Sequence, residues 1–274
     1  MEKAIFFEEI IHFAAPGEGV VPTLRRLREN GITGIQLSDE HLLQWGEEAL
    51  RADLAAADMH TSVIHYFPRF LSDDPAVFEE AVTHSLRTME LCVRMGCHRL
   101  MVVPLPRSDV KGKEDLPRAQ AGMIEGIRRI QAEADQRGIM LLFENFSTRM
   151  LPYGTVEDAE SILAACPGVR YCFDSGNYHC TRHDVIAAFD RLASKTTMLH
   201  AKCFADSTVE TSIRCDDGGY VYGIPYGEGA VQVPNILSVA RAYDNIEIIT
   251  VEHNALLKKE ELQRSLDILN QYFP

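Results

Sequence analysis

The sequence predicts an α/β protein, a (β/α)8 TIM barrel in which residues 1–274 form a single domain. Two observations carry this prediction. Short apolar and β-branched runs recur along the chain, and each is followed by a longer segment with the apolar spacing of a helix. This alternation continues from one end of the chain to the other without a break in composition, which favours a closed barrel over an open, doubly wound sheet.

Strands and helices are expected to alternate along the chain. The strands are expected at residues 4–8, 34–37, 61–66, 99–104, 140–145, 170–174, 198–202 and 247–252. The helices are expected at residues 20–30, 44–57, 75–95, 116–137, 156–165, 183–193, 233–243 and 259–272. Gly31, Gly96 and Gly138 each stand at or just past one of these helix ends, where a left-handed residue commonly terminates a helix.

Several strands read as nearly continuous apolar runs. Residues 140–143 and 246–251 have this pattern, which is typical of a parallel sheet covered on both faces. No GxGxxG motif follows the first strand, so we expect no dinucleotide site. The longest stretch without either pattern, residues 204–232, is rich in glycine and is expected to form an irregular loop over the functional site.

Composition narrows the choice of partner and compartment. The chain has 27 Lys and Arg against 40 Asp and Glu, a net charge of −13, so we expect no nucleic acid partner. No apolar run approaches the roughly 20 residues of a membrane helix. Residues 1–10 also lack the basic and apolar regions of a signal peptide, so we expect no membrane association and a cytoplasmic protein. The cysteines are scattered and form no CxxC motif, which indicates buried, reduced thiols.

Four consecutive predicted strands end in side chains that can bind a metal ion. The segments LLFEN, YCFD, MLHAK and TVEHN carry Glu144, Asp174, His200 and Glu252. In a (β/α)8 barrel, functional groups gather at the carboxyl ends of the strands. Carboxylates combined with an imidazole suit Mn²⁺, Mg²⁺, Co²⁺ or Zn²⁺. Three carboxylates buried together could not all stay ionised without a compensating charge, so we predict that these residues hold one divalent metal ion.

Three further residues could contact a substrate, and two of them have a more ordinary alternative. His65 ends the third strand, where it could face the substrate or be a hydrogen-bonded residue of the barrel. Lys202 follows His200 by two positions and projects to the same side, where it would neutralise an anionic group. Arg149 lies in the loop after the fifth strand and could clamp a carboxylate or phosphate, or be solvated. His253 should point away from the site and have a structural role.

On these residues the sequence resembles the sugar-phosphate isomerase/epimerase superfamily, the xylose isomerase-like barrels. The four candidate ligands stand in the order of the family's ligand positions, and residues 225–232 (PYGEGAVQ) resemble the family's glycine-rich turn before the seventh helix. The resemblance implies a metal-dependent isomerase or epimerase of a small sugar, sugar phosphate or keto acid, acting through a metal-stabilised enediolate. It further implies that Glu144 and Glu252 act as acid and base on opposite sides of the substrate. Homo-oligomers are common in the family, although the sequence reveals no interface.

The sequence departs from the family pattern at positions that bear on the substrate. Asn177 stands where many members have a substrate-binding histidine, and an amide can donate and accept hydrogen bonds there but cannot titrate. Met150 and Asp206 stand where ketohexose 3-epimerases have glutamate and arginine, so a free-ketohexose 3-epimerase is not expected. A metal-dependent dehydratase of the inosose or dehydroshikimate type remains an alternative, because it begins with the same proton abstraction. An apurinic endonuclease is disfavoured by the net charge and by missing histidines.

Overall fold

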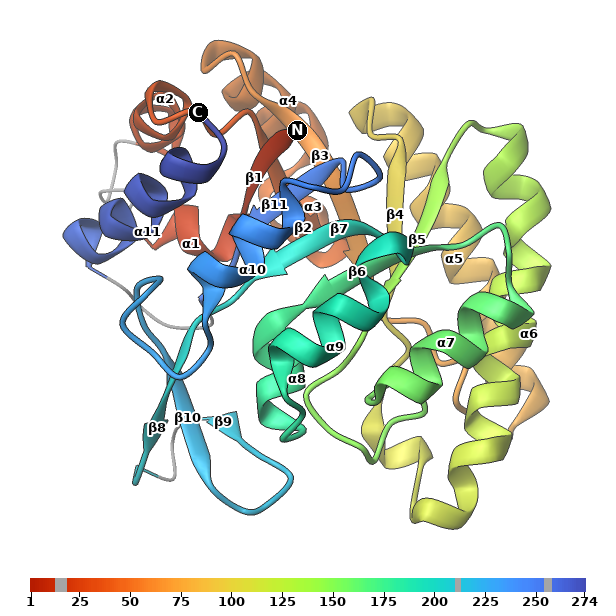
Figure 1. The fold of residues 1–274 in the computed structure, drawn as a ribbon. Helices are drawn as coiled ribbons and strands as arrows, with labels where there is room; N and C mark the ends of the chain where they lie inside the picture. Colours follow the sequence, from red (N-terminus) through yellow and green to blue (C-terminus); the bar gives the residue numbers. More distant parts are fainter. Residues whose placement is uncertain (13–18, 210–212, 254–257) are drawn as a thin grey trace.

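Parallel strands close into a barrel in the computed structural model, which describes residues 1–12, 19–209, 213–253 and 258–274 (Figure 1). The barrel strands are β1 (Glu2–Phe6), β2 (Gly34–Ser38), β3 (His60–Tyr66), β4 (Arg99–Val102), β5 (Met140–Glu144), β6 (Arg170–Asp174), β7 (Thr196–Ala201) and β11 (Ile248–Val251). Their closed order is β1-β11-β7-β6-β5-β4-β3-β2, and β1 pairs in parallel with both β2 and β11. The predicted (β/α)8 fold is confirmed.

Helices surround the barrel (Figure 1). The longer ones are α2 (Val21–Glu29), α4 (Glu47–Ala56), α5 (Pro75–Met95), α6 (Leu116–Gln136), α7 (Val156–Ala165), α9 (Val185–Leu192), α10 (Val233–Ala240) and α11 (Lys259–Tyr272). Gly31, Gly96 and Gly138 have φ values of 84°, 65° and 66°, so the left-handed ends expected for α2, α5 and α6 are confirmed.

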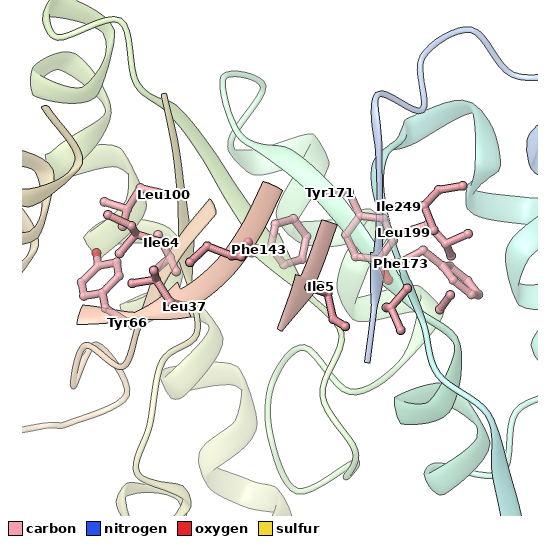
Figure 2. Packing of buried hydrophobic residues seen from close by; sticks show 14 of the residues in the cluster. Ile5, Leu37, Ile64, Tyr66, Leu100, Phe143, Tyr171, Phe173, Leu199 and Ile249 are labelled. Carbon is pink, nitrogen blue, oxygen red and sulfur yellow. The ribbon is translucent and has the colours of Figure 1, made fainter. Parts of the chain in front are cut away.

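Side chains alternate between two layers along each strand, as the period of a β-strand requires. Figure 2 shows part of the outer layer, which packs against the helices: Ile5, Leu37, Ile64, Tyr66, Leu100, Phe143, Tyr171, Phe173, Leu199 and Ile249. The inner layer fills the barrel with Ala4, Val63, Met101, Val103, Leu142, Cys172, Met198 and Ile248. The residue two positions after an inner one also points inward, one layer closer to the mouth. Glu144 follows Leu142 in this way, and His200 follows Met198.

Three short helices at the mouth were not predicted. They are α1 (Phe7–Ile11), α3 (Asp39–Trp45) and α8 (Ser175–Cys180), and each begins directly after a barrel strand. The predicted first strand, residues 4–8, was wrong at its end, because Phe7 already starts α1. Two of these helices are capped by the last residue of the preceding strand: the Ser38 hydroxyl accepts from the His41 N–H at 3.2 Å, and the Asp174 carboxylate accepts from the Asn177 N–H at 2.7 Å.

The prediction of an irregular loop over residues 204–232 was wrong for its first part, whereas residues 224–232 form no helix or strand. The first part contains a small antiparallel sheet of β8 (Phe204–Ser207), β9 (Ile213–Arg214) and β10 (Tyr220–Gly223) in the order β8-β10-β9, and it projects from the barrel at the bottom of Figure 1. Val221, at the centre of the sheet, is fully buried. Strands this short leave too few alternating residues to stand out among the glycines of the segment.

The cysteines are all free and buried, as expected from their spacing. Among the helices formed by the described residues, none combines the length and apolar character needed to span a bilayer.

Candidate metal centre

The candidate ligands converge at the mouth of the barrel. Glu144 and Asp174 are the last residues of β5 and β6, His200 is the penultimate residue of β7, and Glu252 directly follows β11. These four strands are consecutive around the barrel. Because their inward-facing ends lie at one level, their side chains share one side of the mouth.

Polar atoms of the four residues face one another at short range. His200 Nδ1 lies 2.8 Å from Glu144 Oε2, 3.2 Å from Glu252 Oε2 and 3.6 Å from Asp174 Oδ2. All four atoms are buried, and none makes a hydrogen bond of acceptable geometry within the described part of the chain. Two overlapping groups have ligand atoms close enough to hold a metal ion: Glu144 with Cys172 and His200, and Asp174 with His200 and Glu252.

Lys202 is the cation already present beside this group. Its Nζ lies 2.8 Å from Asp174 Oδ2 and 2.5 Å from Glu252 Oε1, and its side chain is buried. Burial opposes the charged ammonium, but Asp174 and Glu252 raise the pKa of Lys202 above its ordinary value. The pKa of Asp174 is lowered, because Lys202 and His200 outweigh the effect of its burial. Lys202 therefore stays charged and paired with two of the ligands.

The other two candidate ligands, Glu144 and His200, both have raised pKa values. Burial raises the pKa of Glu144, although the nearby His200 opposes the shift. The pKa of His200 is raised well above its ordinary value, because Cys172, Glu144 and Asp174 outweigh the effect of its burial. If a metal ion took the place of the second ring proton of His200, the formal charges of the three carboxylates (−3) and Lys202 (+1) would sum to −2. One divalent cation would neutralise this charge, and the mixed oxygen and nitrogen donors suit such an ion.

His65 also faces the mouth. It lies between two aromatic rings, with centroid distances of 5.6 Å to Phe6 and 5.5 Å to Phe67, and Phe6 in turn contacts His200 at 5.1 Å. Burial lowers the pKa of His65 to about 3, so its imidazole is neutral, and its Nδ1 has no hydrogen-bond partner among the described residues. Sequence reasoning missed Phe6 and Phe67, although both stand two positions from an inward-facing residue.

Asn177 is held close to the ligands by hydrogen bonds to the backbone. Its Nδ2 donates to the carbonyl of Asn145 at 2.9 Å. Asn145 was not singled out from the sequence, yet its side chain accepts from the Asp174 N–H at 2.8 Å and donates to the Asp174 carbonyl at 2.9 Å. The two amides therefore tie the ends of β5 and β6 together.

Arg149 is not brought to the centre. Its Nε donates to the carbonyl of Thr181 at 3.0 Å, and its backbone N–H donates to Asp216 at 2.7 Å. It lines a surface pocket with Lys113 and Arg182, and none of the candidate metal ligands lines that pocket. The loop after β5 turns away from the mouth, a direction that the sequence pattern does not encode.

His253 points away from the mouth, as alternation predicted. Its Nε2 lies 2.8 Å from the hydroxyl of Ser265 on α11, and its ring stacks on Tyr226 at a centroid distance of 5.1 Å. Burial lowers the pKa of His253 to about 3. It is a neutral, structural residue between the barrel and α11.

The buried His253 predicts acid sensitivity. Its folded-state pKa lies below the unfolded value of 6.5, so between pH 6.5 and 3 the unfolded chain binds more protons, and stability falls as the pH falls. In metal-free protein we expect the free energy of unfolding of His253→Gln to fall less steeply with acidification than that of the wild type, by up to about 1.4 kcal/mol per pH unit. Urea titrations between pH 7.5 and 5 measure this, and parallel stability curves would contradict it.

Removal of the Lys202 charge should destabilise the metal-free protein. In Lys202→Met the three buried carboxylates lose their fixed cation, and breaking a buried pair in this way costs about 3–5 kcal/mol. We expect a lower melting temperature for metal-free Lys202→Met than for the wild type, and a larger rise on adding divalent metal. Thermal unfolding with and without metal tests both. A variant as stable as the wild type in chelator would contradict this account of Lys202.

A family model described as xylose isomerase-like TIM barrel matches residues 24–272. The chain belongs to this family. The match covers all of the strands that carry the candidate ligands of this xylose isomerase-like barrel, and the resemblance noted in its sequence is confirmed. No protein of curated function shows significant similarity to the sequence.

Solved structures share the fold at low sequence identity. The IolI protein with a bound zinc atom superposes with a TM-score of 0.75 and 16% identity, over 100% of this chain and 99% of that one. A probable 3-DHS dehydratase, AsbF from Bacillus anthracis, gives a TM-score of 0.75 and 16% identity over 98% and 99% of the two chains. D-psicose 3-epimerase from Clostridium cellulolyticum H10, solved with D-tagatose, gives a TM-score of 0.71 and 12% identity over 99% of this chain and 98% of that one. These likenesses establish the barrel and leave the reaction open.

Proposed function

We propose that this chain is a divalent-metal-dependent isomerase or epimerase of a small sugar, sugar phosphate or keto acid. The observation that carries the proposal is the buried group of Glu144, Asp174, His200 and Glu252, whose carboxylate and imidazole atoms face one another at the mouth of the barrel. When bound there, Mn²⁺, Mg²⁺, Co²⁺ or Zn²⁺ would polarise a substrate carbonyl and its neighbouring hydroxyl, and so acidify the C–H between them.

The two glutamates supply the proton transfers. Glu144 ends β5 and Glu252 follows β11, and β6 and β7 separate these strands in the barrel order. The glutamates therefore stand at the two ends of the row of ligands, and we infer that each reaches a different face of a substrate held between them. One carboxylate removes the proton next to the carbonyl and the other returns a proton, which is positioned acid–base catalysis.

Substrate contact in this proposal falls to His65 and Lys202. The neutral His65 lies at the mouth between Phe6 and Phe67, and its Nδ1 makes no hydrogen bond to any residue that the structure describes. Lys202 offers positive charge toward an anionic group of the substrate while remaining paired with ligand carboxylates. The sequence-based roles of Asn177 and Arg149 in substrate binding gain no support. The Asn177 NH₂ donates to the Asn145 carbonyl, and Arg149 donates through Nε to the Thr181 carbonyl and lines a pocket away from the candidate ligands.

A turnover assay in D₂O tests the proposal. Metal-loaded protein is incubated with a panel of keto-sugars, sugar phosphates and keto acids, and products are analysed by mass spectrometry. Isomerisation or epimerisation keeps the substrate's composition apart from deuterium gained at the reacting carbon. Loss of one water with a new ultraviolet absorbance would establish the dehydratase alternative instead, and absence of any turnover or exchange across the panel would overturn the assignment. Light scattering on the same sample measures whether the protein is a homo-oligomer.

A further inference from the structure

Gln36 contacts the candidate ligand His200 from across the barrel. Gln36 lies on β2 and His200 on β7, and β11 and β1 separate these strands in the barrel order. The side-chain oxygen of Gln36 lies 2.9 Å from His200 Nε2, and both residues are fully buried. This hydrogen bond therefore passes through the interior of the barrel, directly behind the atoms that face the carboxylates.

Met101 determines which end of the Gln36 amide meets the histidine. Gln36 Nε2 lies 3.8 Å from Met101 Sδ on β4. A thioether sulfur can only accept, whereas the two ends of an amide differ in that NH₂ donates and oxygen accepts. The NH₂ group must therefore face Met101, and the amide oxygen must face His200. An oxygen in that position requires a proton on His200 Nε2.

We propose that Gln36 is a positioning residue that holds His200 with Nε2 protonated and Nδ1 free to bind a divalent cation. With the Nε2 proton held by Gln36, a divalent cation can take the place of the proton on Nδ1, and it is Nδ1 that lies 2.8 Å from Glu144 and 3.2 Å from Glu252. Histidine ligands generally donate their second ring N–H to such an acceptor, which fixes the tautomer and the ring plane. The inference rests on the metal centre proposed above.

The neutral amide also suits the charge of the centre. A carboxylate at position 36 would add a fourth negative charge to the three beside His200, whereas the amide supplies the same acceptor without it. A leucine of similar size at position 36 would fill the same space but could not accept the hydrogen bond from His200. Replacing Gln36 with leucine therefore separates the acceptor role from simple packing.

Zinc binding to the full-length protein tests the role of Gln36. Zn²⁺ affinity is measured by competition with a chromophoric chelator, and we expect Gln36→Leu to bind about 10- to 100-fold more weakly than the wild type. Gln36→Glu, which keeps an acceptor, should bind at least as tightly as the wild type. Met198→Leu is the packing control, since Met198 lies in the inner layer one level below His200, and its affinity should be unchanged. Circular dichroism establishes that each variant is folded.

The protonation site of the His200 ring is a second observable, and it would not depend on Gln36 if Gln36 only filled space. Two-bond ¹⁵N–¹H correlation spectra of the zinc-loaded wild type should show His200 protonated at Nε2 and bound through Nδ1. A bare or zinc-bound Nε2 would overturn the inference, as would Gln36→Leu binding zinc with wild-type affinity while the wild type itself binds. Should Gln36→Leu fail to fold, the spectra of the wild type and Gln36→Glu still decide. A wild type that binds no zinc, manganese or magnesium would instead overturn the metal centre itself.

Discussion

Glu144→Gln is expected to lose about 10²- to 10⁴-fold in turnover while the barrel stays folded, because an amide can neither remove nor carry the proton. Glu252→Gln should lose turnover to a similar extent. The two variants should differ in whether the substrate C–H proton exchanges with deuterium from D₂O. With a substrate whose proton faces Glu144, Glu252→Gln should still introduce deuterium, whereas Glu144→Gln should not. Steady-state kinetics and mass spectrometry measure both effects.

Metal content must be followed in parallel, since both glutamates are also candidate ligands. Each variant is assayed at saturating metal, and elemental analysis reports the bound ion. Glu228→Gln is the matched control, because its carboxylate pairs with Arg264 on the surface at 2.7 Å and should be dispensable for turnover. Near-normal turnover by metal-loaded Glu144→Gln and Glu252→Gln would refute their acid–base roles.

Stripping the divalent ion with a chelator should abolish turnover and lower the melting temperature. An ion present at 100 times its dissociation constant stabilises the folded state by about 2.7 kcal/mol. For a domain of this size that corresponds to a fall of roughly 5 °C or more on stripping. Re-addition of Mn²⁺, Mg²⁺, Co²⁺ or Zn²⁺ should restore both properties, and the ion that does so at the lowest concentration identifies the preferred metal.

Asp174→Asn gives the corresponding negative control. Asp174 is fully buried and pairs with Lys202, so the variant loses one ligand charge while keeping the shape of the side chain. Its melting temperature should respond little to added metal. A wild-type melting temperature that is unchanged by every ion, together with full turnover in chelator, would contradict the metal centre.

Two regularities of the sequence determined the architecture and the position of the centre. The alternation of short apolar runs with helical segments specifies a parallel barrel, because each pattern matches the period of one kind of element. The alternation of side chains along a strand then specifies which residues face inward. Glu144, Asp174 and His200 could be assigned to the mouth from the sequence because each stands at the carboxyl end of such a run.

Contacts that depend on barrel closure were decided only by the tertiary structure. Gln36 and His200 are 164 residues apart in the chain, and they meet because closure brings β2 opposite β7. The pairing of Lys202 with Asp174 and Glu252, and the turn of Arg149 away from the mouth, likewise depend on how neighbouring strand ends and loops pack. The period of the apolar pattern predicts which face of a single helix or strand is buried. The distance between two side chains on different elements follows from the stagger and closure of the whole sheet, which no local pattern contains.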